Sequence, residues 1–288
     1  DLVQNADNAF KARLFGASLR VCFHDAGEVL VSDPTDRQGP DGCLQTVNMD
    51  NEGLVELDEE VNAILEPIWQ EHCDKISRGD FWAFWGKLVV EFAASSPVSV
   101  DFYFGRVDRT DCSGGAGRLP QDSSQGMVDI QRVFVDQMGL TLEDAVALIG
   151  AHSVGHMSAD VAGFGHPSDS PGASSVDFNA WDLTSWVLDN SFFHALLGAE
   201  WTVFLDEAGS HQAYSASPNL PLMMLNVDME LAYVIGGDET TPLQERCGPP
   251  NNCERQPSTL DIVNAFSDSN EFFLDEFAKS FTKMCNVG

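Results

Sequence analysis

The chain has 288 residues, and 43% of them are hydrophobic, which is enough for the core of one large domain or of two lobes around a cleft. Its 15 Lys and Arg residues against 45 Asp and Glu residues give a net charge of −30. So acidic a chain repels phosphate backbones and anionic lipids, which excludes nucleic-acid binding. A basic partner, divalent cations or a salty medium remain compatible with this charge.

Apolar residues three and four positions apart predict helices over most of the chain, and few segments alternate with period two. The helical stripes cover residues 10–21, 54–68, 128–138 and 146–149. Thr141, followed by acidic residues, is a typical helix N-cap, and Gly150 with Gly155 brackets the helix end. This pattern places His152 at a helix C-terminus.

Glycine- and proline-rich segments predict loops at 32–40, 110–125, 164–175 and 236–257. The most apolar region, 81–104, is interrupted by charged and polar residues, so no membrane-spanning helix is expected. The sequence shows no internal repeat.

Seven cysteines, without the paired spacing of a zinc site, favour a secreted protein with some disulfides. A chain that begins without Met agrees with removal of a signal peptide, although a trimmed chain looks the same. Because seven is odd, one thiol stays free unless it pairs between chains, and Cys22 in its apolar helical pattern is the candidate.

Two histidine clusters stand out. Arg20 and His24 are four residues apart and therefore share a helix face, and their apolar neighbours favour a pocket over a solvated surface pair. The second cluster holds His152 and His156 among small residues that let a flat, bulky group approach the backbone. A zinc site is not favoured there, because Ser153 stands where a metalloprotease needs Glu. The remaining histidines are interpreted as structural: His72, His166, His194 and His211.

Four motifs together carry a family resemblance: Arg-x-x-Phe-His-Asp at 20–25, Gly-Arg-Val-Asp at 105–108, Gly-Arg-Leu-Pro at 117–120 and Ile-Gly-Ala-His-Ser at 149–153. Their order and spacing resemble those of the plant, fungal and bacterial haem peroxidase superfamily. The sequence is most similar to cytochrome c peroxidase and other class I members. The resemblance implies an all-α fold of about ten helices in a single domain, 1–288. Haem b would lie between a distal lobe, about 1–118, and a proximal lobe, about 119–288.

On the distal side, the resemblance makes His24 the acid/base and Arg20 the cation that stabilises charge as the O–O bond breaks. Asn51 matches the residue that accepts the other ring N–H of that histidine. Gln45 stands where the family commonly has Glu, so we expect an altered hydrogen-bond chain. Phe23 departs from class I, which has Trp there, and agrees with the secreted classes.

On the proximal side, His152 matches the haem iron ligand and Asp228 its carboxylate partner, which would favour a ferryl state. The apolar neighbours of Asp228 argue against a solvated helix-surface carboxylate. Trp181 matches a tryptophan that carries a radical in cytochrome c peroxidase. A packing role beneath the haem is at least equally favoured, because calcium nearby would disfavour a cationic indole.

The resemblance also implies a proximal Ca²⁺ site, which class I enzymes lack, so the chain resembles a hybrid of classes. Its oxygen ligands would be Ser153, Asp182, Thr184, the Val187 carbonyl and Asp189. A distal Ca²⁺ site is left open. Asp25, the Gly39 carbonyl and Asp41 match it, but Cys43 stands where Ser or Thr donates oxygen, and a thiol is a poor calcium ligand.

The resemblance implies an enzyme that reduces H₂O₂ through an oxo-ferryl state and oxidises small phenolic or aromatic donors, with Pro120 at the haem edge. Manganese is not favoured, because its carboxylate positions hold Arg13, Ala17 and Ser158. Ascorbate is not favoured either, since its binding arginine would fall near Val161.

Two alternatives remain. Trp181 and the charge of −30 are compatible with a basic redox protein, such as a cytochrome c, as electron donor. A calcium- or haem-binding extracellular interaction protein without turnover is the alternative of another class. The presence of the whole set of distal and proximal residues argues against lost activity: Arg20, His24, Asn51, His152 and Asp228.

Overall fold

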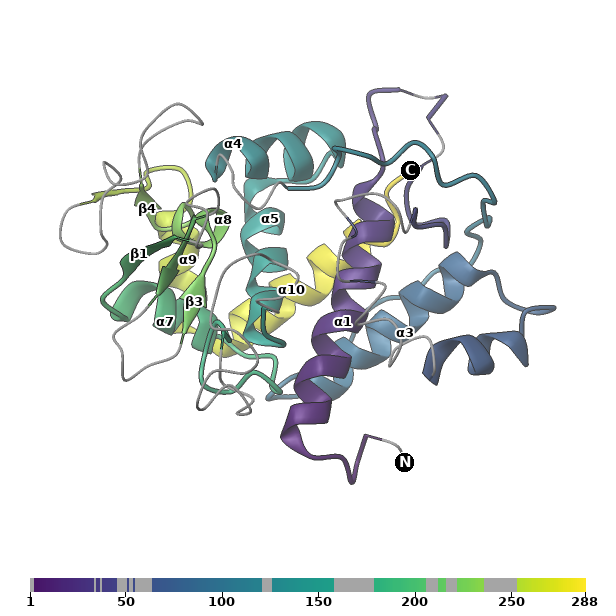
Figure 1. Cartoon of the computed structure of the whole chain (residues 1–288), viewed down its shortest axis with the longest axis horizontal. Coiled ribbons are helices and arrows are strands. Elements are labelled where there is room, and N and C mark those ends of the chain that lie inside the picture. Colours follow the sequence, from purple (N-terminus) through teal and green to yellow (C-terminus); the bar gives the residue numbers. More distant parts are fainter. Residues whose placement is uncertain are drawn as a thin grey trace.

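The computed structural model describes residues 3–33, 35–36, 38–45, 51, 54, 64–120, 126–157, 179–205, 212–215, 222–235 and 253–288. Their helices are α1 (Asn8–Gly27), a helical segment at 64–70, α3 (Arg78–Ala93), α4 (Met127–Ile130), a π-helix (Gln131–Gln137), α5 (Leu142–Ile149), a 3₁₀ turn (Gly150–Ser153), α7 (Ser191–Gly198), α8 (Asn226–Met229), α9 (Leu260–Asp268) and α10 (Asn270–Met284). The predominance of helix confirms the predicted all-α class (Figure 1). The division into two lobes near residue 118 stays a prediction.

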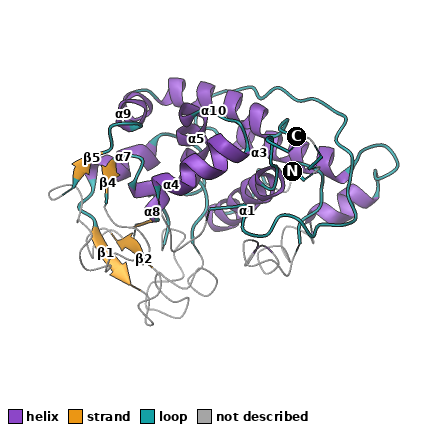
Figure 2. Cartoon of the chain, turned by 90° about the horizontal axis from the view of Figure 1, so that it is seen from above, coloured by secondary structure: helices purple, strands orange, loops and turns teal. Residues whose placement is uncertain are grey.

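Five short strands accompany the helices. They are β1 (Thr202–Leu205), β2 (Gln212–Ser215), β3 (Met223–Met224), β4 (Tyr233–Val234) and β5 (Glu254–Arg255). Strands β1, β2 and β3 form an antiparallel sheet in that order, with Thr202 opposite Ser215, and β4 pairs antiparallel with β5. Segments of two to four residues are too short to show period two, so the sequence did not predict them. Figure 2 shows the strands gathered toward one end of the molecule.

Helix α1 is long because its sequence supplies a cap and an apolar surface. The Asp7 side chain accepts the Phe10 N–H at 2.8 Å, and residues such as Leu14 and Phe15 are buried. The helix packs on α3 and also contacts α10 and the 3₁₀ turn. A Cβ placed on Gly16 would lie 2.8 Å from the Cα of Gly155, so α1 touches the backbone just after the 3₁₀ turn.

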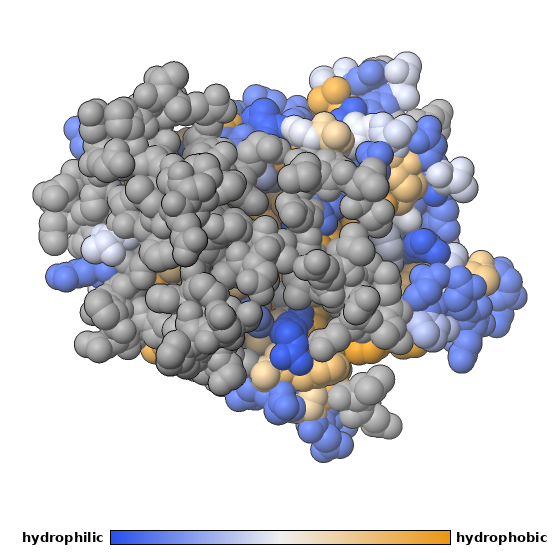
Figure 3. All heavy atoms as spheres, viewed as in Figure 1, coloured by the Kyte–Doolittle hydropathy of each residue, from blue (hydrophilic) through white to orange (hydrophobic). Residues whose placement is uncertain are grey.

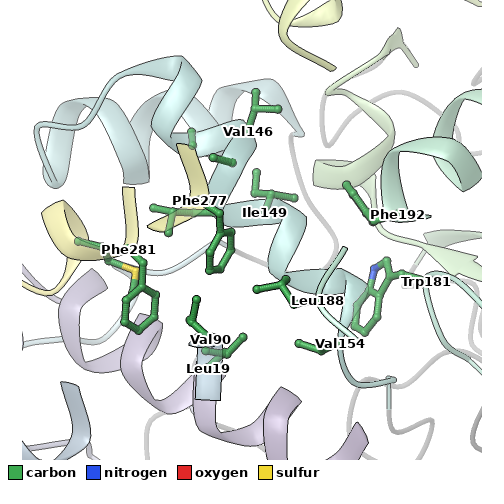
Figure 4. Close-up of a cluster of buried hydrophobic side chains, with 14 of the residues drawn as sticks. Leu19, Val90, Val146, Ile149, Val154, Trp181, Leu188, Phe192, Phe277 and Phe281 are labelled. Atoms are coloured by element: carbon green, nitrogen blue, oxygen red, sulfur yellow. The ribbon is translucent and has the colours of Figure 1, made fainter. Parts of the chain in front are cut away.

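The core is formed around α10, whose phenylalanines recur on one face. Phe273, Phe277 and Phe281 are all almost fully buried, and α10 packs on α5, which contributes Val146 and Ile149. Figure 4 shows Phe277 and Phe281 converging with Val146, Ile149 and side chains of neighbouring elements. The amphipathic pattern therefore places α5, and the turn that follows it, against the centre of the molecule.

The predicted start of α5 is confirmed. Thr141 and Asp144 form a reciprocal capping box, with the Thr141 hydroxyl accepting the Asp144 N–H at 3.1 Å. The helix ends at Ile149, and the chain tightens into the 3₁₀ turn that carries His152. The second predicted stripe is seen only at its end, because residues 55–63 lie outside the described part of the chain.

The structure pairs Cys43 with Cys112 in a disulfide, and the secreted location that the cysteine content favours stays a prediction. Cys22 is a free thiol, as predicted, and among the described residues Cys73 and Cys285 are free as well. In the same part of the chain no helix is both long and apolar enough to cross a membrane. On the face drawn in Figure 3, hydrophilic residues are common among the described ones at the molecular edge, in keeping with the charge.

Candidate functional site

The last two turns of α1 carry the distal pair. Arg20 Nε lies 3.2 Å from His24 Nε2, which confirms that the two side chains share a helix face. His24 is only 7% exposed, so the pair is not a solvated surface pair.

The tautomer of His24 follows from its partners. The Arg20 guanidinium can only donate, so Nε2 of His24 must accept. The other ring nitrogen then carries the proton, and Nδ1–H donates to Asn51 Oδ1 at 2.8 Å. Asn51 in turn donates from Nδ2 to the backbone carbonyl of Gln45 at 3.0 Å. Because the main-chain carbonyl of Gln45 makes this contact, having Gln at 45 instead of the Glu common in the family leaves the contact in place.

Burial sets the charge of the distal histidine. Loss of solvent, followed by the positive charge of Arg20, lowers the pKa of His24 to about 3, although the bond to Asn51 opposes this shift. His24 is therefore a neutral base over the physiological range. The Phe23 ring stands edge-on to it, with centroids 5.8 Å apart, and stacks on Phe134 of the π-helix at 5.3 Å.

The proximal residues converge on one buried carboxylate. Asp228 is 0% exposed and lies at the start of α8, where Oδ2 accepts the Leu225 N–H at 2.7 Å. Oδ2 also accepts the Trp181 indole N–H at 2.7 Å, and Oδ1 lies 2.7 Å from His152 Nδ1. The surface alternative for Asp228 is thus wrong, since a buried carboxylate needs such donors.

The geometry around His152 fits a haem ligand. A carboxylate has no proton to give, so Nδ1–H of His152 donates to Asp228 and Nε2 is left to bind a metal. The Trp181 ring stacks on the imidazole at 4.2 Å and fixes its plane. The His152 side chain is 31% exposed although both partners are buried, so the imidazole faces an open side.

The proximal calcium candidates also come together. Ser153 Oγ lies 2.7 Å from Asp182 Oδ2 and 3.2 Å from the Val187 carbonyl, and the Thr184 N–H donates to Asp182 Oδ1 at 2.7 Å. Burial, with a contribution from the charge of Asp189, raises the pKa of Asp182 to about 7. A buried carboxylate among neutral oxygens is a donor set suited to Ca²⁺.

The distal calcium candidates form a second acidic group. Asp25 accepts the N–H groups of Gly42 and Cys43, and burial together with the charge of Asp41 raises its pKa well above the usual value. Both carboxylate oxygens of Asp41 are buried without a hydrogen-bond partner, and the Gly39 carbonyl accepts the Asp41 N–H at 2.7 Å. Cys43 is in a disulfide, so it has no thiol to offer a cation.

Other sequence candidates lie nearby or outside the described residues. His156 is partly buried, and its Nδ1 has no hydrogen-bond partner. Burial and the charge of Arg13 lower the pKa of this histidine. Pro120 follows Leu119, which is buried beside α1. Ser158 and Val161 lie outside the described part of the chain.

The sequence alone missed two features of the site. One is the stacking of Phe134 on Phe23, and the other is the π-helical turn that carries Phe134. The apolar stripe at 128–138 predicted an ordinary helix. No sequence signal distinguishes a π-turn from an α-turn there, because both bury the same apolar residues.

Comparison with known proteins gives consistent matches. A family model described as Peroxidase matches residues 2–246. L-ascorbate peroxidase 1, cytosolic, of Oryza sativa subsp. indica is 34% identical over 183 residues, which cover 63% of this chain and 65% of that protein. A putative heme-binding peroxidase of Aspergillus fumigatus is 27% identical over 94% of this chain and 73% of its own length. The mitochondrial cytochrome c peroxidase of Yarrowia lipolytica is 26% identical over 94% of this chain and 67% of its own length. The match thus spans less than two thirds of the rice protein.

Proposed function

The chain belongs to the peroxidase family, and from that premise we propose that it is a haem b peroxidase that uses H₂O₂ to oxidise small phenolic or aromatic donors. The observation that carries the proposal is a neutral, buried His24 held in one tautomer between Arg20 and Asn51. The pairing of His152 with Asp228 supplies the matching metal-binding side.

The distal residues can move one proton between the two oxygens of peroxide. Nε2 of His24 takes the proton from the inner oxygen and returns it to the outer one, which leaves as water. For Nε2 to accept, Arg20 must leave its bond to His24. Its guanidinium is then free to stabilise the negative charge that develops on the departing oxygen.

The proximal residues tune the metal. Haem bound to His152 would supply the two electrons that reduce peroxide, and two donor molecules would each return one. Asp228 accepts the His152 Nδ1–H and so gives the imidazole anionic character. The second oxygen of Asp228 accepts the Trp181 indole N–H, which fixes the orientation of the carboxylate relative to the indole ring.

The choice of donor is tested by giving the haem-loaded protein peroxide with either a phenol or reduced cytochrome c. The proposal predicts steady phenol turnover that Trp181→Phe leaves within a few-fold. Cytochrome turnover that falls with added salt and with Trp181→Phe, without phenol turnover, would support the protein-donor alternative instead. A protein that binds haem but consumes no peroxide would leave only the interaction-protein alternative.

The names of the relatives do not decide the donor. The rice relative is named for ascorbate, and one Yarrowia relative for cytochrome c. We do not propose ascorbate or manganese, because the positions that the family resemblance assigns to them, including Arg13 and Ala17, hold unsuitable residues. A phenol needs only an accessible haem edge, which we assign to Pro120.

We further propose that Ca²⁺ occupies the group around Asp182. A ligand that binds only the native state stabilises it, by about 2.7 kcal/mol at a free concentration near 100 times Kd. We therefore expect EDTA to lower the melting temperature of the wild type. In Asp182→Asn the effect should shrink.

Metal analysis of the same proteins separates the two candidate sites. Loss of one equivalent of calcium in Asp182→Asn assigns the proximal site, and loss of one in Asp41→Asn assigns the distal site. A wild-type protein that contains no calcium and melts identically with and without EDTA would contradict the proposal.

The Cys43–Cys112 disulfide also supports our proposal that the protein works in an oxidising, extracellular compartment.

A further inference from the structure

The π-helix between α4 and α5 is held in a register that pairs residues five apart. The Met138 N–H bonds to the Val133 carbonyl, five residues earlier, at 3.0 Å. Arg132 Nη1 lies 2.9 Å from Gln137 Oε1, and Gln131 Nε2 lies 3.1 Å from Asp136 Oδ1. In an α-helix, residues five apart point roughly 140° away from each other, so neither side-chain pair would meet across a regular turn.

The pair Arg132 and Gln137 binds one neighbouring segment, residues 117–119. Arg132 donates to the carbonyls of Gly117 and Arg118, both at 3.2 Å, and to that of Leu119 at 2.9 Å. Gln137 Nε2 donates to the Arg118 carbonyl at 2.7 Å. The guanidinium is itself fixed by an ion pair with the buried carboxylate of Asp129 at 2.8 Å. The three successive carbonyls of 117–119 are thus held from one side.

The last of the three carbonyls belongs to the peptide bond before Pro120. Proline has no N–H, so this peptide group can form a hydrogen bond only through its carbonyl. Arg132 donates to that carbonyl. The Leu119 side chain meanwhile packs beside the distal helix. A Cβ on Gly27 would lie 2.6 Å from Leu119 Cδ2 and 3.8 Å from the Phe23 ring.

The same π-helix also contacts the distal site directly, through Phe134 stacked on Phe23. One short element therefore supports the distal aromatic ring and fixes the backbone that leads to Pro120. Such departures from α-helical register are frequent at functional sites. Here the register has a defined consequence, since it brings Arg132 and Gln137 onto one face.

We propose that Arg132 and Gln137 are positioning residues, and that the π-turn exists to aim them at 117–119 and so set the access of the aromatic donor at Pro120. This proposal rests on the proposed function, because it concerns the donor step of that reaction. The peroxide step, which uses His24, does not depend on the pair. The two steps should therefore separate in kinetics.

The test compares variants in the haem-loaded protein. Arg132→Met removes the guanidinium, Arg132→Lys keeps its charge, and Gln137→Glu keeps the acceptor for Arg132 while losing the donor to Arg118. Gln131→Ala is the matched control, because it breaks the other pair of the same spacing. We expect Arg132→Met and Gln137→Glu to raise KM for a phenolic donor about tenfold, as for one or two lost hydrogen bonds. Arg132→Lys should recover part of this loss.

Three readouts distinguish positioning from general damage. The rate of the first spectral change with peroxide should stay within about twofold of wild type in every variant. Hydrogen exchange of the 115–120 region should speed up in Arg132→Met and Gln137→Glu, and not in Gln131→Ala. The Soret band should be unchanged.

The proposal is overturned if Arg132→Met and Gln137→Glu both keep the wild-type donor KM and exchange rates. It is also overturned if Gln131→Ala changes the donor KM and the exchange rates as much as these two variants do. Should Arg132→Met fail to fold, Gln137→Glu alone decides. A wild type that oxidises no phenol would refute the proposed function instead. The exchange comparison would then still show whether the pair holds 117–119.

Discussion

Replacing His24 by leucine slows the first spectral step with peroxide by about 10²–10⁴-fold, the contribution typical of a positioned proton carrier. Leucine fills a similar volume but cannot accept the proton from the inner oxygen. Arg20 stays in place but then has no base beside it. Stopped-flow mixing of haem-loaded protein with peroxide measures this rate directly. His72→Leu, the same change at an exposed position, is the control and should leave the rate unchanged.

The same base predicts a pH profile. Because burial and Arg20 lower the pKa of His24 to about 3, the neutral form dominates above that pH. The wild-type rate should therefore be level from neutral pH downward and fall only as the pH approaches about 3. Arg20→Leu removes the positive charge, so the pKa of His24 rises and the fall should begin at higher pH. A midpoint that stays put in Arg20→Leu would contradict the assigned interaction.

Asp228→Asn should lower the rate of the peroxide step by about 10–100-fold, as is typical when a partner of a metal-bound histidine is lost. An amide has one oxygen, whereas the carboxylate serves His152 through Oδ1 and both Trp181 and Leu225 through Oδ2. The new NH₂ group would face N–H donors on one side. The imidazole then loses its anionic character, its orientation, or both.

A control variant separates the specific role of Asp228 from a general effect of negative charge. Asp261→Asn removes the charge of an exposed carboxylate in the first turn of α9, and it controls for a general effect of lost negative charge. The iron–histidine stretching frequency of the reduced protein should fall in Asp228→Asn and stay unchanged in Asp261→Asn. Equal peroxide rates in wild type and Asp228→Asn would rule out a role of Asp228 in tuning the metal.

Local sequence patterns predicted the parts of the site that lie within one helix. Arg20 and His24 share a face because they are four residues apart, and Thr141 caps α5 as its pattern indicated. The pairing of His152 with Asp228, 76 residues later, followed only from the family resemblance. No periodicity reports a contact between such distant segments.

The remaining differences have physical reasons of their own. Asn51 is anchored by the main chain of Gln45, a contact that side-chain identity does not encode. The disulfide between Cys43 and Cys112 is one of many pairings that seven cysteines allow. The π-turn at Arg132 arises from packing and backbone register, because its residues are compatible with an ordinary helix.

The most direct test of the central claim is a hemin titration of the isolated chain, read by its Soret band and by resonance Raman spectroscopy of the reduced form. We expect one hemin per chain and an iron–histidine stretch that disappears in His152→Gly and returns when imidazole is added. A chain that takes up no hemin, or one whose iron–histidine stretch survives in His152→Gly, would contradict the account.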